Sequence, residues 1–496
     1  IMIYKFLGIN ERRILRLIEI TIGMTTWLTI TMPIWLSFWH PALMAYFVLA
    51  FDIYWLYKSA TLCINAVRSY LKLSVHLKIN WKEKALKQKN WKKVQHVVII
   101  PEYREPKSVL KDTLENLTLQ DFPKEKIIIV LATEKRDEMA VKISNELKAE
   151  YEGKFGKFLI TYHPDAIGEV KGKSSNMAFA AKEITKLLEK ENADLNFITV
   201  TSCDADALLH PKYFSYLTYL FLTDTDRKYH FYQSAIMFYS NIWKIPLPGR
   251  VINTLGSINS LAQLVLDKRL INFSTYSLSL ATAKDVNYWG RSVIPEDYHM
   301  FFKTYFKYGD RVLTKPIFLP TLADAAESTS FWKTIVNQYE QMKRWAWGVS
   351  DDPWLIKNLF LHKEIPLWDR MTKLFYILVD NHLIWPTNWF ILTLGSNIPP
   401  LINNSFQRTI LGHSLPMISS IILTLSTLFL IGVVIVDMKL KPQRPESFAK
   451  WKTPILYLQW LSLPIVGLLL STLPGLDAHT RLLLGKRLEY RVTEKV

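Results

Sequence analysis

Two adjoining apolar stretches restrict the fold of this chain more than any other feature of its sequence. Residues 20–39 carry no charged side chain, and residues 41–57 carry only Asp52. Each stretch approaches the roughly 20 apolar residues that cross a bilayer. The break at Trp39-His40-Pro41 between them indicates a tight hairpin. We therefore expect two transmembrane helices with both outer ends in the cytoplasm. A cleaved signal peptide is the alternative, but a second span follows at once, with no small-residue cleavage site between the two.

The composition argues against an ordinary soluble enzyme. Hydrophobic residues make up 49% of the 496 residues, yet 21% are charged and the middle of the chain has a globular pattern. This mixture fits a membrane-embedded protein with one sizeable soluble domain. The net charge of +17 comes largely from basic clusters beside the apolar stretches, at residues 82–93 and 439–452. Such clusters are retained on the cytoplasmic side, so we read them as a topology signal and expect no nucleic-acid partner.

The two cysteines, Cys63 and Cys203, cannot form a disulfide framework, and this suits a soluble domain in the reducing cytosol. The chain is thus predicted to be an integral protein of the plasma membrane with a cytosolic domain. We assign residues 1–93 to an N-terminal membrane region that ends in a basic linker.

The middle region, residues 94–330, alternates strand-length apolar runs with helical patterns. The runs are residues 97–101, 127–132, 158–163 and 197–204, and helical stretches lie at 108–119 and 174–189. Continuous apolar runs are typical of strands buried on both faces, and the intervening helices indicate βαβ units. Ligands of such α/β sheets collect at the carboxyl ends of the strands. Glu102, Glu134 and Asp204 are expected at that edge.

The pattern changes again after residue 330. Residues 331–370 are predicted to form interface helices, the first of them with an apolar stripe and interleaved charges. A core helix is the alternative for this segment. Residues 371–496 form a C-terminal membrane region with three apolar stretches, at 374–395, 417–436 and 455–473, and a basic tail. Three single crossings would leave that tail outside, against the positive-inside rule, so a broken or re-entrant last span stays open.

Asp204 and Asp206 follow the fourth predicted strand. Two carboxylates one residue apart can share a face, and they suit a divalent cation bound to substrate phosphates. The alternative is an ordinary turn, because Asp is common after strands. Ahead of this pair, Lys173 is expected to open a helix, where a cation and exposed backbone amides can bind phosphate.

Two motifs follow the Asp pair. A carboxylate of Glu296-Asp297 could serve as a general base, although acidic residues are also common at the start of a surface helix. Gln341, Arg344 and Trp345 lie in the run QMKRWAWG, about 45 residues further on. A Gln-x-x-Arg-Trp match arises by chance in about one chain of this length in a hundred.

The motifs PEYREP, KGKSSN, DAD, PED and QMKRW, in this order and between apolar segments, resemble the family 2 glycosyltransferases of the cellulose, chitin and hyaluronan synthase superfamily. The resemblance implies a Rossmann-like GT-A catalytic domain in the cytosol, inserted between N- and C-terminal transmembrane helices. It also implies a nucleotide-diphospho sugar donor, with a UDP-linked donor favoured, and Mg²⁺ or Mn²⁺ as cofactor. Tyr103 and Glu105 would hold the nucleobase and ribose end of the donor, and Glu134 would contact the nucleotide.

The same resemblance implies the reaction centre. Lys173 would contact the diphosphate, Asp206 would ligate the metal, and Asp204 would lie toward the ribose or the metal. Asp297 would be the catalytic base, with Glu296 beside it. The enzyme would invert the anomeric centre of the sugar as it passes to a glycan or lipid-linked acceptor.

The segment with Gln341, Arg344 and Trp345 would cover the diphosphate and border the acceptor. The chain departs from the family pattern at Pro295, where Thr is usual, and at Thr133-Glu134, where Asp-Asp is usual. Elongation of a polysaccharide, possible passage of the chain through the membrane, and transfer of one sugar to a lipid or polyprenyl carrier all stay open. An inactive channel or scaffold is the non-enzymatic alternative.

Overall fold

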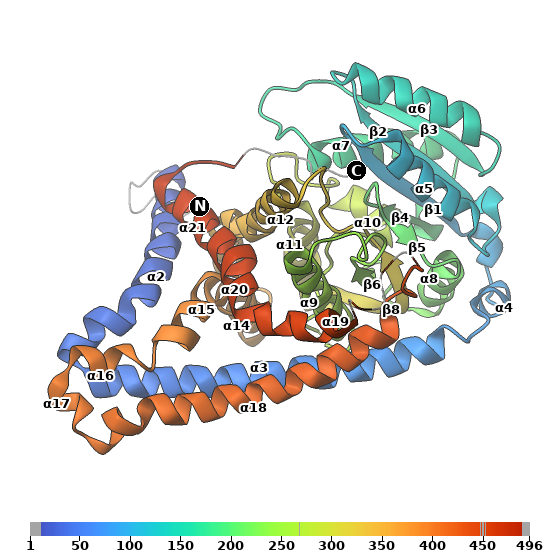
Figure 1. The fold of residues 1–496 in the computed structure, drawn as a ribbon. Coiled ribbons are helices and arrows are strands. Elements are labelled where there is room, and N and C mark those ends of the chain that lie inside the picture. The colour runs from blue at the N-terminus through green and yellow to red at the C-terminus, as the bar shows by residue number, and fades with distance from the viewer. Residues whose placement is uncertain (1–10, 267, 447, 449–450, 452, 489–496) are drawn as a thin grey trace.

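A computed structural model describes residues 11–488 except 267, 447, 449, 450 and 452. Lys450 and Lys452 of the second basic cluster, and residues 489–496 of the basic tail, lie outside the described residues. Within them the chain forms an α/β domain beside a group of long apolar helices (Figure 1).

The core of the domain is an eight-stranded mixed sheet in the order β3-β2-β1-β4-β7-β6-β8-β5. Its strands are β1 Gln95–Glu102, β2 Ile127–Glu134, β3 Lys157–His163, β4 Ile198–Ser202, β5 Leu208–Leu209, β6 His230–Met237, β7 Tyr276–Ser279 and β8 Leu313–Leu322. The first four are parallel, so the four predicted strands are confirmed. β7 runs antiparallel to β4 and to β6, and nothing in the sequence pattern predicted β5 to β8.

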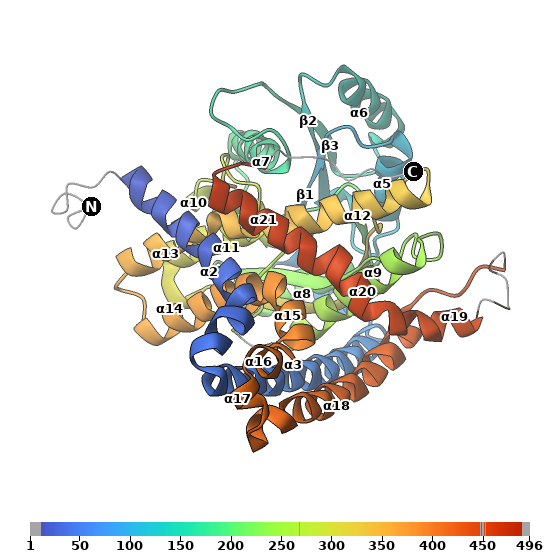
Figure 2. The ribbon, with the colours of Figure 1, turned by 60° about the vertical axis from the view of Figure 1, so that its left-hand side comes forward.

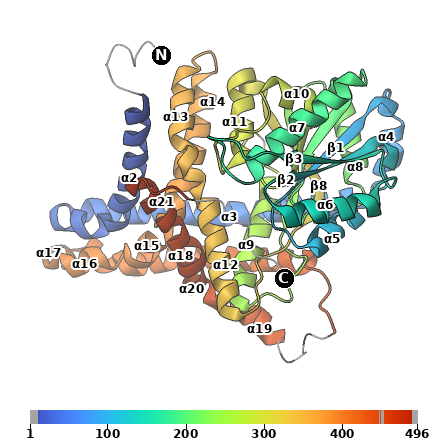
Figure 3. The same cartoon turned by 90° about the horizontal axis from the view of Figure 1, so that it is seen from above.

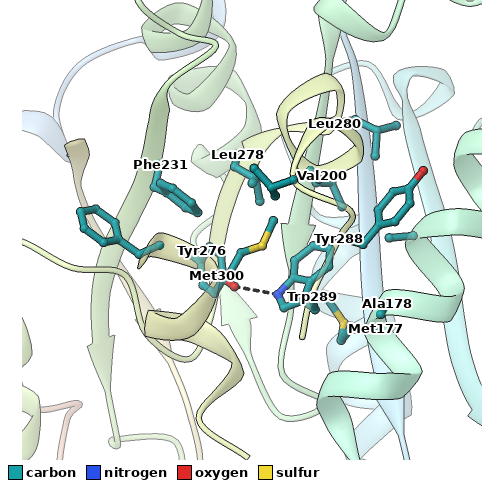
Figure 4. Packing of buried hydrophobic residues seen from close by; sticks show 14 of the residues in the cluster. Met177, Ala178, Val200, Phe231, Tyr276, Leu278, Leu280, Tyr288, Trp289 and Met300 are labelled. Carbon is teal, nitrogen blue, oxygen red and sulfur yellow. Dashed lines mark hydrogen bonds between the residues drawn. The ribbon is translucent and has the colours of Figure 1, made fainter. Parts of the chain in front are cut away.

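Helices cover both faces of the sheet. One face packs against α4 (Trp81–Leu86), α5 (Lys107–Thr118), α6 (Glu138–Tyr151) and α8 (Tyr213–Thr223). The other packs against α7 (Lys173–Lys190), α10 (Leu280–Asp285) and α11 (Glu296–Tyr308). On this second face, the indole N–H of Trp289 donates to the hydroxyl of Tyr276 at 2.8 Å, so that the one polar atom of each buried ring is satisfied (Figure 4).

His96 on β1 is a buried group that makes the domain sensitive to acid. Its ring nitrogens lie 2.7 and 2.8 Å from the hydroxyls of Thr199 and Thr218, and burial lowers its pKa to about 3. In the unfolded chain the imidazole takes up a proton near pH 6.5. Stability is therefore retained above pH 6.5 and falls as the pH drops toward 3, by up to about 1.4 kcal/mol per pH unit. We expect His96→Gln to flatten this part of the melting temperature against pH curve, and an unchanged curve would contradict the assignment.

Within the described residues, four helical segments are long and apolar enough to cross a membrane: α2 (Glu11–Trp39), α3 (Pro41–His76), α18 (Ile410–Leu440) and Thr453–Leu484. The last contains α19 (Thr453–Leu458), α20 (Leu463–Gly467) and α21 (Leu473–Leu484). α2 ends and α3 begins on either side of His40, so the predicted break between two helices is confirmed. α3 and α18 run side by side (Figures 1 and 3). Ala66 and Leu73 of α3 continue into a core with Phe318 of β8, which ties this pair to the sheet.

The remaining helices connect the sheet with the apolar segments. They are α9 (Leu247–Gln263), α12 (Phe331–Ala346), η5 (Trp347–Asp351), α13 (Asp352–Leu361), α14 (Leu367–Leu374), α15 (Ile384–Leu394), α16 (Ile398–Ile402) and α17 (Asn404–Gln407). Figure 2 shows α12 beside α21. Lys343 of α12 lies 3.3 Å from Asp477 of α21 in an ion pair.

Only two of the three predicted C-terminal spans correspond to helices of this membrane-length set. The stretch at 374–395 instead joins α14, the π-helix η6 (Phe375–Leu383) and α15. Asp380 lies within it and pairs with Lys58 of α3 at 2.8 Å. Pro386 of α15 has no N–H to donate to the carbonyl of His382, so the regular hydrogen-bond pattern is interrupted beside η6. A charged and irregular segment packed on protein explains the difference.

Candidate active site

The polar residues predicted from the sequence gather at the carboxyl edge of the four parallel strands. Glu134 ends β2, and Asp204 and Asp206 follow β4. Lys173 opens α7, and Glu296 opens α11. Because the strands are parallel, their carboxyl ends meet, and the helices that start above this edge bring their first residues into the same space.

Lys173 is the centre of this group. Its Nζ lies 2.6 Å from Oδ1 of Asp204 and 2.8 Å from Oε1 of Glu296. Burial by itself would lower the pKa of the ammonium, but the carboxylates of Asp204, Glu296 and Asp297 outweigh it and hold that pKa well above its ordinary value. Burial raises the pKa of Glu296, against the opposing effect of Lys173. Lys173 is therefore a fixed positive charge that holds three carboxylates together.

Ser274 links the same residues, and the sequence analysis missed it. Its backbone N–H donates to Oδ2 of Asp297 at 3.0 Å, its hydroxyl donates to Oδ2 of Asp204 at 2.5 Å, and its carbonyl accepts from Lys173 at 3.3 Å. Its φ of 58° lies in the left-handed region. A serine is uncommon there, and such a conformation persists only where the surroundings enforce it. Nothing in the run around Ser274 marks it, because its role comes from backbone geometry.

Asp297 is held mainly by backbone donors. Besides the Ser274 amide, the N–H of Tyr298 donates to Oδ1 at 2.8 Å, and the amide of the buried Asn272 donates to the Asp297 carbonyl at 2.9 Å. The side chain of Asp297 is partly exposed, whereas Glu296 is buried. An oriented carboxylate with access to solvent can accept a proton from a bound hydroxyl group.

Asp204 and Asp206 are the residues of the site that could bind a divalent cation. Oδ2 of Asp206 accepts from the N–H of Asp324 at 3.0 Å. Among the described residues, no group of three or more His, Cys, Asp or Glu side chains is arranged to hold a metal by itself. Mg²⁺ is commonly bound by one or two carboxylates together with substrate phosphates, so a pair fits. Three carboxylates around one lysine also leave an excess of negative charge for a cation to balance.

The nucleotide residues expected on β1 and β2 lie together beside this cluster. Oε1 of Glu134 accepts from the N–H of Gly172 at 3.0 Å, and its other oxygen pairs with Arg136. The guanidinium groups of Arg104 and Arg136 lie 5.1 Å from the ring centroid of Tyr103. Glu134 therefore fixes the turn before Lys173, and Arg136 joins it to the Tyr103 ring. A pocket opens here, lined by Glu134, Arg136, His163, Pro164, Asp165, Ala166, Glu169, Val170, Lys171 and Ser175.

Glu105 lies near this end of the site. Burial raises the pKa of the neighbouring Glu102 to about 8, the charges of Asp137, Glu105 and Glu134 add to this rise, and a hydrogen bond from the Glu105 backbone opposes it. Glu102 was expected only to mark the end of a strand, and both of its carboxylate oxygens are buried.

The residues of the QMKRW run lie on α12, where Gln341 contacts its own helix and Trp345 contacts a residue outside it. Oε1 of Gln341 accepts from Gln338 at 3.1 Å, and the ring of Trp345 lies 5.4 Å from that of Phe238. Arg344 is half-buried. The connection to the site is indirect, because the Tyr298 hydroxyl donates to the carbonyl of Gly348, just after α12.

A mixed α/β sheet that collects one lysine and several carboxylates at its carboxyl edge has the arrangement of a ligand-binding site. Two family models match the chain. The model described as "Glycosyl transferase family group 2" matches residues 199–438, and "Glycosyltransferase like family 2" matches residues 95–258. The chain is a transferase, and the matches support a family 2 glycosyltransferase.

Distant similarities to solved structures are also found. The mannosyltransferase PcManGT from Pyrobaculum calidifontis, solved with GDP-Man and Mn²⁺, is 13% identical with a TM-score of 0.40, over 79% of this chain and 99% of that one. S. aureus TarS 1-349, solved with UDP-GlcNAc, is 14% identical with a TM-score of 0.36, over 68% of this chain and 90% of that one. No curated protein matches the chain.

Proposed function

We propose that the protein is an inverting family 2 glycosyltransferase with a GT-A domain, of the cellulose, chitin and hyaluronan synthase type. It moves a sugar from a nucleotide-diphospho sugar to a growing glycan at the cytosolic face of the plasma membrane. The observation that carries the proposal is the Ser274 junction, which holds Asp297, Asp204 and Lys173 around one point. A base, an acidic pair and a buried cation are the groups that such a transfer requires.

The geometry supports the following mechanism. Tyr103 and Glu105 hold the nucleoside. The ammonium group of Lys173 stabilises the negative charge that develops on the leaving diphosphate. Asp297 takes the proton of the acceptor hydroxyl as its oxygen forms a bond to C1 of the sugar. The bond from C1 to the diphosphate breaks on the opposite face, so the anomeric configuration inverts. A bound Mg²⁺ or Mn²⁺, held by Asp206 and Asp204, would supply charge neutralisation for the diphosphate.

The membrane placement rests on the four apolar segments and the basic clusters. In the part of the chain that the structure describes, two membrane-length segments precede the sheet and two follow it, so single crossings by all four would put both outer ends on the same side. The basic residues at 82–93 favour the cytosol for that side. Phe331, Trp332 and Val336 of α12 are 48%, 74% and 55% exposed, which suits a helix lying at the membrane surface. Gln341, Arg344 and Trp345 would then border the acceptor.

The test is turnover by the full chain purified in detergent. We expect release of nucleotide from one member of a panel of UDP- and GDP-linked sugars, with Mn²⁺ or Mg²⁺ present. The length of the product with labelled donor distinguishes a polymerase from an enzyme that adds a single sugar to a lipid carrier. Absence of turnover and of donor binding across the panel would contradict the proposal and favour a channel or scaffold.

Asp206→Ala is expected to weaken binding of the donor nucleotide only when Mg²⁺ or Mn²⁺ is present, because the carboxylate would act through the cation. Calorimetry with and without a chelator measures this difference. Asp194→Ala is a matched control, since Asp194 is exposed and lies before the other end of β4. An equal loss of affinity in both conditions would assign Asp206 a structural role.

A further inference from the structure

Two buried histidine–aspartate pairs lie outside the site described above. One of them includes a histidine of α11, the helix that also carries Asp297. Nδ1 of His299 lies 2.7 Å from Oδ2 of Asp351, and Nδ1 of His382 lies 2.8 Å from both carboxylate oxygens of Asp352. The side chains of His299 and Asp351 are 8% and 4% exposed, and those of His382 and Asp352 are 10% and 0% exposed. A buried carboxylate is costly unless it is hydrogen-bonded, so each pair holds its two elements in one arrangement.

The pairs join three elements that the sequence separates widely. His299 lies on α11, two residues after Asp297, and His382 lies on the π-helix η6. Asp351 and Asp352 are adjacent, at the end of η5 and the start of α13. Because η5 follows α12 without a break, both pairs hold the C-terminal end of the helix that carries Gln341, Arg344 and Trp345.

Glycine allows the close packing between the pairs. The hydroxyl of Tyr298 donates to the carbonyl of Gly348. A Cβ at Gly348 would lie 3.3 Å from Nε2 of His382 and 3.4 Å from Cε1 of Tyr298. On the other side of His299, its ring lies 4.2 Å from that of Trp354. The side chains of Tyr298, His382 and Trp354 therefore surround the contacts between η5, α11 and η6, and they leave little space for η5 to move.

The π-helix η6 contacts both α3 and α13. Within nine residues, η6 presents Asp380 to Lys58 of α3 and His382 to Asp352. Irregular helical turns of this kind occur frequently at functional sites. Through Asp380, the η5 segment is thus connected to an apolar helix of membrane length.

We infer that Asp351 and Asp352 are positioning residues for sugar transfer, which fix the end of the Q-x-x-R-W helix against the helix of the base. Through His299, Asp351 sets the distance between α12 and the start of α11. Through His382, Asp352 fixes the start of α13 against η6. Neither carboxylate touches the reacting atoms. The inference rests on the proposed function, because it assigns these residues to the alignment of Asp297 with the acceptor side of the same site.

The test compares Asp351→Ala with Asp351→Asn in the full-length chain in detergent. Asparagine keeps an oxygen that accepts from His299, whereas alanine removes it. With the donor sugar found in the panel, we expect Asp351→Ala to lower kcat by about 10–100-fold, since small displacements of reacting groups have effects of this size. The KM for donor should change by less than about 3-fold, because Tyr103 and Glu105, which are proposed to hold the nucleoside, are not joined to α12 by these pairs. Asp351→Asn should restore most of kcat.

His230→Ala is the matched control. His230 pairs with Asp224 at 2.6 Å and is similarly buried, with 6% and 14% of the two side chains exposed. It begins β6, which runs in the same direction as β4, so it lies at the opposite edge of the sheet from the site. This variant should lose stability but keep the kcat of its folded fraction. Equal losses of kcat per folded molecule in Asp351→Ala and His230→Ala, or no rescue by asparagine, would overturn the inference.

Hydrogen–deuterium exchange provides a readout that does not depend on activity. Asp351→Ala is expected to increase exchange at residues 341–354 without increasing it in β1, β2 and β4. Unchanged exchange at 341–354 would contradict the positioning role. Absence of wild-type turnover would instead contradict the proposed function, so the two failures are distinguishable.

Discussion

Asp297→Asn is expected to lower kcat by about 10²–10⁴-fold while leaving nucleotide affinity nearly unchanged. A general base contributes to the transition state and adds little to ground-state binding, and factors of this size are typical when one is removed. The amide of asparagine keeps one oxygen to accept from Ser274, which donates to the native carboxylate at 3.0 Å. It cannot serve both this donor and the N–H of Tyr298, so we also expect a stability loss of about 1 kcal/mol.

Single-turnover measurements with labelled donor, together with calorimetry, separate these effects. Asp310→Asn is a suitable control, because Asp310 is exposed just beyond the end of α11. Wild-type turnover in Asp297→Asn would remove Asp297 from the mechanism. A parallel loss of turnover and nucleotide affinity would mean that the residue shapes the donor site.

Lys173→Met is expected to cost about 3–5 kcal/mol of unfolding free energy and to abolish turnover. Removing one partner of a buried ion pair leaves the opposite charges without compensation. Here Asp204 and Glu296 lose a partner at 2.6 and 2.8 Å. Methionine keeps much of the length and volume of the side chain, so the effect reports on charge.

The pH dependence of this variant has a definite sign. Burial raises the pKa of Glu296, and without Lys173 the charges of Asp297 and Asp204 add to that rise. A raised pKa in the folded state favours folding below the ordinary pKa of the carboxyl, and this advantage is lost as the pH rises through the folded value. The difference in melting temperature between Lys173→Met and wild type should therefore shrink as the pH falls.

Lys171→Met provides the comparison. Lys171 lies in the same loop, with 63% of its side chain exposed and Asp165 at 3.7 Å. Its replacement should change the melting temperature little at any pH. If Lys173→Met and Lys171→Met behave alike, the buried cation does not stabilise the site.

The parts of the fold that follow from side-chain pattern could be predicted. The apolar runs of β1 to β4 and the break at His40 are local signals, and the polar residues after these strands share an edge because the strands are parallel. β6 was missed because it mixes apolar residues with Gln233 and Ser234, both of which are buried. Burial of that kind depends on neighbours that are distant in sequence.

The site shows the same division. The chemistry of their side chains predicted four of the site residues: Asp204, Glu296, Asp297 and Lys173. Lys173 contacts Asp204 and Glu296, and Asp297 follows Glu296 directly in the chain. Ser274 could not be predicted from the sequence, because its contacts depend on a positive φ that directs its N–H, hydroxyl and carbonyl groups toward different partners. The stretch at 374–395 was assigned to the membrane by composition, and its ion pair with Lys58 could not be read from a linear sequence.

The length of α3 has a mechanical consequence. Its 36 residues extend about 54 Å at 1.5 Å per residue, whereas the hydrocarbon layer is about 30 Å thick. In the proposed membrane arrangement, α3 would extend more than 20 Å beyond the hydrocarbon layer on the side where Leu73 packs in the core with β8, and α18 packs along α3. Under the proposed function, the fixed length of α3 would set the distance between the candidate active site and the bilayer, and an acceptor would have to present its hydroxyl group at that distance.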